Sequence, residues 1–213
     1  MFRDRRDAGK KLAKILKKYY NEKVLVLAIP RGGVIVADEI AKELNANLDI
    51  VVPRKIGSPG NPELAIGAVA QDGSLYLDEN LIRDLEVSED YIKKQKEKEV
   101  NEIKRRLKIY RKGKKFPSLK DKILIVVDDG IATGSTMKVT IKFLKKRKPK
   151  KIIIATPVVP KDTAEELREV VDEVIALEEP IFMQAIGEFY LDFRQTEDEE
   201  VIKILKEYYE KFR

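Results

Sequence analysis

The stretch Ile123–Thr136 constrains the fold of this 213-residue chain more than any other. It opens with five apolar, mostly β-branched residues, Ile-Leu-Ile-Val-Val, which is typical of a strand buried on both faces of a parallel sheet. Asp128 and Asp129 follow, and a Gly/Ser/Thr loop then enters a predicted helix. Such a loop suits a phosphorylated sugar, because backbone N–H groups and the helix dipole attract phosphate. The carboxylates can accept hydrogen bonds from hydroxyls or help hold a divalent cation.

The composition limits the chemistry that the chain can use. Cysteine and histidine are both absent, which excludes thiolate chemistry, disulfides and the commonest general base and metal ligand. Acid–base chemistry is left to Asp, Glu, Lys or Tyr. The N-terminus is charged from Arg3 onward, and no apolar run approaches the roughly 20 residues of a membrane span. We therefore expect a cytoplasmic protein without a membrane segment.

Charged residues make up 38% of the chain, which carries a net charge of +6. A surface this rich in Lys and Glu is typical of a thermophile. The positive charge suits an anionic ligand. It also fits nucleic acid, but the cations are interspersed with acids and no recognised reading motif accompanies them. We therefore do not expect nucleic acid as a partner.

Strands and helices alternate along the chain, which predicts an α/β fold with a doubly wound, mostly parallel sheet flanked by helices. The apolar pattern predicts strands over 24–29, 48–52, 123–127, 152–159 and 174–177, and helices over 5–20, 34–44 and 88–110. Asp162 and Glu165 have the spacing of a capping box, which predicts a further helix from there to Val171. We expect one domain over residues 1–213, with a helical insertion over about 80–118. Ligands of such sheets bind at the carboxyl ends of the strands.

Two further segments at predicted strand ends carry positive charge beside glycine. Arg31-Gly32-Gly33 follows the first strand and can form an anion cradle with a fixed cation beside it. Residues 53–63 contain Arg54 and Lys55 in a run rich in Pro, Gly, Ser and Asn, which predicts a mobile cationic loop.

Ile123–Thr136 closely resembles the phosphoribosyl-diphosphate (PRPP) signature of the type I phosphoribosyltransferases, which is an apolar strand, two acids and a Thr-Gly-x-Thr loop. The resemblance extends over nearly the whole chain. Arg-Asp-Arg near the start, Ile-Pro-Arg-Gly-Gly-Val and Arg-Lys-x-Gly-x-Pro-Gly are similar to a subgroup of phosphoribosyltransferases of unassigned substrate. The fold implied is the type I fold, with a small C-terminal hood over about residues 179–195.

The resemblance implies transfer of ribose 5-phosphate from PRPP to a nitrogenous base, purine-like among the candidates, in nucleotide salvage, with release of pyrophosphate. It also implies a homodimer and Mg²⁺ held mainly through PRPP, with Asp128 and Asp129 as candidate ligands. Arg54, Lys55 and Asp129 are the implied catalytic residues, and Asp128 and Asp129 would bind the ribose. The implied 5-phosphate site is Ala132, Thr133, Gly134, Ser135 and Thr136, the pyrophosphate site is Arg31, Gly32 and Gly33, and the base site in the hood is Phe189, Tyr190 and Asp192.

Two further features follow from the resemblance. The family often has a cis peptide bond in the pyrophosphate loop, which would be Pro30–Arg31 here. Many members also have an acid just before Thr-Gly, whereas this chain has Ala132, which leaves Asp129 as the candidate general base.

Aromatic core packing is the alternative for the hood residues. A PRPP-binding regulator without turnover and an unrelated phosphosugar-binding protein are the alternatives for the whole chain.

Overall fold

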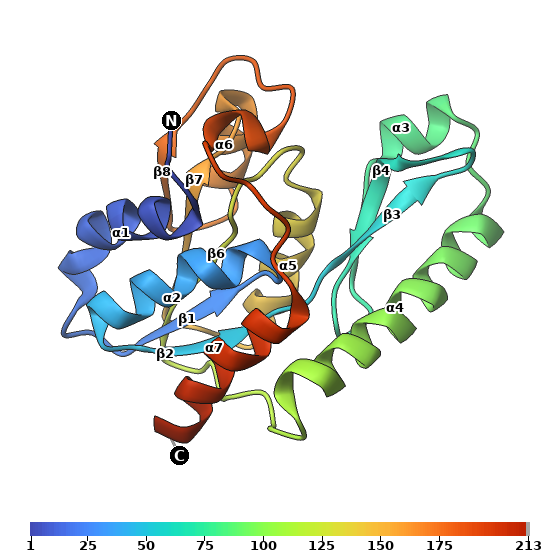
Figure 1. Ribbon diagram of the computed structural model, residues 1–213. Helices are drawn as coiled ribbons and strands as arrows, with labels where there is room; N and C mark the ends of the chain where they lie inside the picture. Colours follow the sequence, from blue (N-terminus) through green and yellow to red (C-terminus); the bar gives the residue numbers. More distant parts are fainter. Residues whose placement is uncertain (212–213) are drawn as a thin grey trace.

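The structure is a computed structural model that describes residues 1–211 (Figure 1). Its helices are α1 (Arg5–Leu16), α2 (Gly32–Leu44), α3 (Glu79–Asp84), α4 (Glu89–Arg111), α5 (Ser135–Lys145), α6 (Lys161–Arg168) and α7 (Asp198–Lys211), with short 3-10 helices η1 (Lys17–Tyr19) and η2 (Ile186–Phe189). Its strands are β1 (Val24–Ala28), β2 (Asn47–Ile50), β3 (Arg54–Ser58), β4 (Asn61–Val69), β5 (Leu75–Leu77), β6 (Ile123–Val127), β7 (Lys151–Val158) and β8 (Glu173–Glu178). No helix within residues 1–211 has the length and apolar character needed to cross a membrane.

A five-stranded parallel sheet in the order β2-β1-β6-β7-β8 forms the centre of the molecule, which confirms the predicted fold class. The register places Ala28, the last residue of β1, opposite both Ile50 of β2 and Val127 of β6. These three strands therefore end level with one another. The segments that follow them leave from the same edge of the sheet.

Helices cover both faces of this sheet, as the fully apolar β6 predicts. Alternate residues of the strands face opposite layers. One layer joins Ile123, Ile125 and Val127 to the apolar faces of α1, α2 and α7. The other layer joins Leu124 and Val126 to α5 and α6. Burial on both sides fixes β6, and with it the position of the loop that follows.

The predicted mobile loop over residues 53–63 is wrong in its secondary structure. β3 and β4 pair there as an antiparallel ribbon that continues into β5 (Figure 1). Ile56 and Ser58 are buried, and Gly60 makes the turn at a φ of 76°. Ile56 is the one large apolar residue among the five of β3, so the sequence shows no alternation of apolar and polar residues there. Backbone hydrogen bonds to β4 and packing against α4 hold the strand instead.

Residues 79–111 form α3 and the long helix α4, where the sequence predicts a helical insertion. Ser88 caps α4, since its Oγ accepts a hydrogen bond from the Tyr91 backbone N–H at 3.3 Å. The helix runs alongside the β3–β4 ribbon (Figure 1). The Tyr91 hydroxyl donates to the Gly57 carbonyl at 3.0 Å and ties the helix to the ribbon.

The capping box predicted for Asp162 and Glu165 is wrong. α6 begins at Lys161, with Pro160 in the N-cap position, and ends at Arg168 rather than Val171. The Asp162 carboxylate instead accepts a hydrogen bond from the backbone N–H of Thr163, its neighbour, at 2.8 Å. Pro160 has a ψ of 144°, outside the helical region, and the helix begins at the next residue, so Asp162 lies inside the first turn and cannot be its N-cap.

Candidate functional site

The segment after β6 forms a loop that opens directly onto the first turn of α5. Gly134 occupies the N-cap position at a φ of 73°, in the left-handed region that glycine adopts at little cost. The Thr163 hydroxyl, from α6, donates to the Ala132 carbonyl at 3.0 Å and fixes the loop from behind. The backbone N–H groups of the first turn of α5 have no partners within the helix and so can bind an anion.

The segment after β1 approaches this loop closely. A Cβ on Gly32 would lie 1.8 Å from Asp129 Oδ2, and one on Gly33 would lie 2.9 Å from the Val127 carbonyl oxygen. Only glycine fits at either position. The Pro30–Arg31 peptide bond is cis, as the family resemblance predicts. Arg31 lies 3.7 Å from an Asp198 oxygen, and its side chain remains partly exposed.

The β3–β4 ribbon brings two cations to the same region. Arg54 Nε donates to Glu99 Oε2 on α4 at 2.8 Å, and the Glu99 side chain is 10% exposed. Lys55 forms no ion pair with any residue from 1 to 211. Its positive charge acts instead on Asp128, where it opposes a rise in the pKa of that carboxyl.

These three segments enclose one cavity of about 640 Å³. Its wall includes Arg31, Gly32, Arg54, Lys55, Asp128, Asp129, Ala132, Thr133, Gly134 and Thr136. Predicted site residues from three separate parts of the sequence therefore meet in one place. Gly33 and Ser135 lie behind the surface, where Ser135 is buried and its hydroxyl is 3.3 Å from that of Thr133.

The two adjacent carboxylates have different surroundings. Burial is the largest cause of a strongly raised pKa at Asp128, and the charge of Asp129 adds to it. A hydrogen bond from the Asp129 backbone N–H to Asp128 Oδ1, at 2.9 Å, opposes the shift. Asp129 instead has a cation beside it, because Arg5 Nε donates to its Oδ2 at 2.6 Å. The pair therefore combines one buried acid with one acid in a salt bridge.

Comparison with known proteins decides the family. The family model described as "Phosphoribosyl transferase domain" matches residues 4–194. A Mycobacterium tuberculosis protein named provisionally as a phosphoribosyl transferase is 38% identical over 205 residues, which are 96% of this chain and 46% of that protein. The chain belongs to the phosphoribosyltransferase family. It spans less than half the length of this relative.

Solved structures of other proteins share the fold of this phosphoribosyltransferase chain. The crystal structure of TT1426 from Thermus thermophilus matches it with a TM-score of 0.81 and 38% identity, covering 98% of this chain and 99% of that one. The structure of AQ2163 from Aquifex aeolicus matches with a TM-score of 0.50 and 12% identity, covering 84% of this chain and 76% of that one. The second likeness supports the fold alone.

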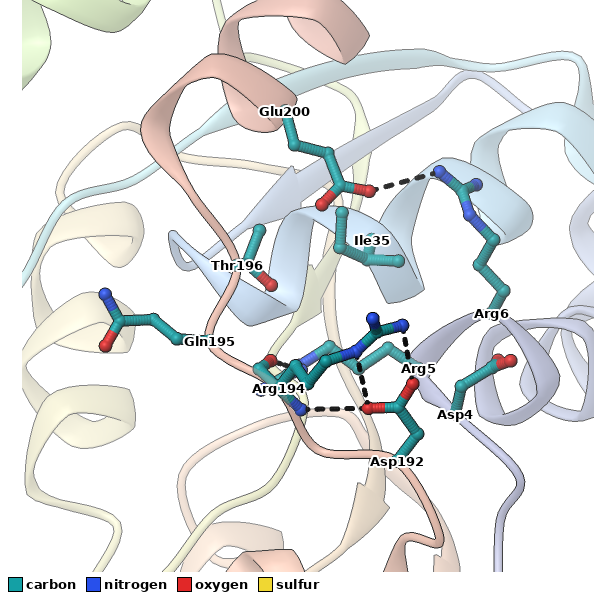
Figure 2. A pocket seen from close by; sticks show the side chains of 9 residues that line it. All are labelled: Asp4, Arg5, Arg6, Ile35, Asp192, Arg194, Gln195, Thr196 and Glu200. Carbon is teal, nitrogen blue, oxygen red and sulfur yellow. Dashed lines mark hydrogen bonds and ion pairs between the residues drawn. The ribbon is translucent and has the colours of Figure 1, made fainter.

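The structure places the predicted base-binding residues outside the cavity. Tyr190 is buried, stacks on Phe193 with ring centroids 4.8 Å apart, and donates its hydroxyl to the Asp129 carbonyl at 2.6 Å. Asp192 lines a second pocket, of about 410 Å³, where hydrogen bonds from Arg194 lower its pKa (Figure 2). Phe189 packs with the aromatic cluster around Phe2. Within the hood segment, residues 179–195, Ile186 is the residue that lines the cavity.

Sequence reasoning missed a wall of the cavity that α4 provides. Tyr91, Gln95, Lys98, Glu99 and Arg106 all line the cavity. Their spacings of three, four and seven residues place them along one side of the helix. Polar residues at this spacing could indicate a helix face that lines a site. They cannot be distinguished from the many Lys and Glu residues that the same helix exposes to solvent.

The oxygen atoms present fit a magnesium ion that arrives with a phosphorylated ligand. Within residues 1–211 no group of three or more His, Cys, Asp or Glu side chains is placed to hold a metal ion. Asp128 and Asp129 offer the hard oxygen ligands that Mg²⁺ prefers, although Arg5 occupies one oxygen of Asp129. Phosphate oxygens and water would have to supply the other ligands, as is usual for Mg²⁺.

Proposed function

We propose that the protein is a phosphoribosyltransferase that transfers ribose 5-phosphate from PRPP to a nitrogenous base and releases pyrophosphate. The observation that carries this proposal is the single cavity bounded by the loop after β1, the β3–β4 ribbon and the loop after β6. Each segment offers groups suited to a different part of PRPP. Membership of the phosphoribosyltransferase family supports the same donor.

The donor would lie along the carboxyl edge of the sheet. Its 5-phosphate would bind the N–H groups of residues 132–136 at the start of α5, helped by the Thr133, Ser135 and Thr136 hydroxyls. Asp128 and Asp129 would accept hydrogen bonds from the ribose hydroxyls. The diphosphate would bind Arg31, Gly32 and Gly33 on one side and the ribbon cations Arg54 and Lys55 on the other.

The reaction breaks the bond between C1 of the ribose and the diphosphate oxygen, and forms a bond between C1 and a nitrogen of the acceptor. Positive charge develops on the ribose and negative charge on the leaving diphosphate, so Arg31, Arg54 and Lys55 would stabilise the transition state electrostatically. Mg²⁺ bound with PRPP would neutralise part of the same negative charge. The acceptor nitrogen loses a proton, for which Asp129 remains the candidate base.

The acceptor would be a planar nitrogenous base, with purines as the first class to test. Ile131 and Ile186 supply apolar surface to the cavity, which suits the face of such a ring. Phe182 lies in the same hood segment and is 75% exposed, so it is free to contact a base. We place the reaction in nucleotide salvage in the cytoplasm and the protein in a homodimer, which light scattering can check.

A combined binding and turnover assay tests the proposal. Calorimetry with PRPP and Mg²⁺ measures donor binding, and pyrophosphate release in the presence of a panel of purine and pyrimidine bases measures transfer. Binding together with base-dependent release supports the transferase. A protein that fails to bind PRPP under these conditions is not a PRPP-dependent enzyme.

A PRPP-binding regulator without turnover is the second candidate. One observation favours it: Ala132 stands where many family members have an acid. A regulator would bind PRPP in the same calorimetric experiment but release no pyrophosphate with any base in the panel.

A further inference from the structure

The N-terminal motif Arg3-Asp4-Arg5 supplies none of the groups proposed above to bind the donor, yet backbone hydrogen bonds hold the start of the chain against the hood segment. The Phe2 backbone N–H donates to the Phe189 carbonyl at 2.6 Å, and the Leu191 N–H donates to the Phe2 carbonyl at 2.8 Å. The Asp192 N–H donates to the Arg3 carbonyl at 2.9 Å. The segment 1–4 therefore runs beside residues 189–192 and delivers Arg5 to the sheet edge.

Arg5 is bound on several sides at this point. Its Nε donates to Asp129 Oδ2 at 2.6 Å, and its Nη1 donates to the Arg194 carbonyl at 2.7 Å. Its Cζ lies 3.9 Å from the centroid of the Phe193 ring. The side chains of Arg5 and Asp129 are only 11% and 14% exposed. A guanidinium in this setting has one arrangement, because hydrogen bonds and a ring face fix its plane.

Asp129 is fixed in turn. Arg5 holds its Oδ2, and the Tyr190 hydroxyl donates to its backbone carbonyl at 2.6 Å. Within residues 1–211, no cation other than Arg5 forms an ion pair with Asp129, and this ion pair uses Oδ2. Asp129 also lines the cavity. Its other carboxylate oxygen, Oδ1, is therefore the one that a ligand hydroxyl can use.

We propose that Arg5 is a positioning residue that orients Asp129 toward the ribose hydroxyls of PRPP and links the hood segment to the donor site. This inference rests on the proposed function of the cavity. Arg5 itself touches no part of the donor; it acts through Asp129. A hood segment displaced from residues 1–4 would loosen Arg5, and the ribose contact would weaken with it.

Pyrophosphate separates this role from general damage to the site. PRPP would use the contact with Asp129, whereas free pyrophosphate would bind the loop after β1 and the ribbon cations without it. We therefore expect Arg5→Ala to weaken PRPP binding about tenfold, the usual cost of losing the charged hydrogen bond from a ribose hydroxyl to Asp129, and to leave pyrophosphate affinity unchanged. Arg5→Lys keeps the charge but loses the planar guanidinium that donates from two nitrogens. Its PRPP affinity should lie between those of Arg5→Ala and the unmodified protein.

Arg6→Ala is the matched control. Arg6 is the next residue on α1 and lines the same pocket as Arg5, but it binds Asp38, Glu39 and Glu200 instead of Asp129 (Figure 2). Both affinities should stay at their original values in this variant. The same pocket opens onto Arg5, so methylguanidinium should restore part of the PRPP affinity of Arg5→Ala.

A double-mutant cycle with Asp129→Asn decides whether Arg5 acts through Asp129. If it does, Arg5→Ala should have little further effect on PRPP binding once Asp129 is changed. Equal losses in both backgrounds, or a parallel loss of pyrophosphate affinity, would overturn the inference while the proposed function stands. Failure of the unmodified protein to bind PRPP would overturn the proposed function, and the inference with it.

Discussion

Asp128 and Asp129 are neighbours in the chain, yet their environments divide the proposed work between them. The pKa of Asp128 is raised, mainly by burial, while Asp129 lies against the Arg5 guanidinium. A ligand that brings hydroxyl donors and positive charge would favour the ionised form of the buried acid.

Replacing both acids tests their role as ribose ligands. We expect Asp128→Asn combined with Asp129→Asn to weaken PRPP binding by about tenfold or more, since each loses a charged acceptor. Calorimetry measures the change. Asp84→Asn, at an exposed position on α3, is the control and should bind as the original protein does. Unchanged PRPP affinity in the double variant would refute the ribose role of both acids.

Gly32 tests the close approach of the two loops. A Cβ at this position would lie 1.8 Å from Asp129 Oδ2 and 2.6 Å from Arg5 Nε, so Gly32→Ala must move the loop or break the salt bridge. We expect this variant to lose affinity for both pyrophosphate and PRPP, measured by calorimetry, while its circular dichroism spectrum stays that of a folded protein. Normal affinity for both ligands would show that the loops are not in the contact described.

At the scale of elements, α4 provides one wall of this site. It closes one side of the cavity and holds the ribbon through Tyr91, while Glu99 orients Arg54. Since Glu99 binds the Nε atom, the outer nitrogens of Arg54 are left for a ligand. The helix thus arranges in advance a cation that the proposed reaction needs at the diphosphate.

Glu99→Gln tests this arrangement. Loss of the charged partner should release Arg54 from its orientation and weaken pyrophosphate binding several-fold, because a loosely held cation must be ordered when the ligand binds. Glu97→Gln, two residues away and on the wall of a different pocket, should leave the affinity unchanged. Titration calorimetry with pyrophosphate compares the two. An increase in affinity for Glu99→Gln would mean instead that Glu99 restrains Arg54 from reaching its ligand.

Elements that bury an apolar face could be predicted from the sequence, and those held by polar contacts could not. The apolar run of β6 and the 3.6-residue pattern of α2 each correspond to a buried element. β3 offers only Ile56 as a buried apolar side chain, and its contact with α4 depends on Tyr91 and Glu99. Hydrogen bonds between residues 34 and 45 positions apart leave no periodic pattern in a single sequence.

For the molecule as a whole, the site depends on strands that end level and on segments brought together from the two ends of the chain. Loops after β1 and β6 were predicted as parts of the site because their residue types suit phosphate. Arg5 was not, since its partners Asp129 and Arg194 lie 124 and 189 residues away. The aromatic residue types of the hood also could not show that Tyr190 is buried against Phe2 and Phe193.

A buried ion pair joins the end of α4 to the central sheet. Arg111, the last residue of α4, donates from Nη2 to Asp49 Oδ1 on β2 at 2.9 Å, and Tyr209 of α7 donates to the same oxygen at 2.9 Å. Arg111 and Asp49 are 6% and 4% exposed. Arg111→Leu should therefore lower the free energy of unfolding by about 3 kcal/mol or more, because Asp49 would be left as a buried, uncompensated charge.

The loss should depend on pH in a definite direction. Burial raises the pKa of Asp49 above its ordinary value of 3.8, and Arg111 opposes that shift, so the pKa should rise further in Arg111→Leu. A carboxyl whose pKa is higher in the folded state stabilises the fold below its unfolded pKa and loses that contribution as the pH rises through the folded value. The destabilisation should thus be smallest near pH 4 and increase toward about pH 8, as urea unfolding at each pH would measure.

Arg105→Leu, which removes an exposed pair with Glu102 on the same helix, should cost less than about 1 kcal/mol near neutral pH. A loss for Arg111→Leu that is equally small, or that does not change with pH, would mean that Asp49 does not depend on Arg111 for its charge.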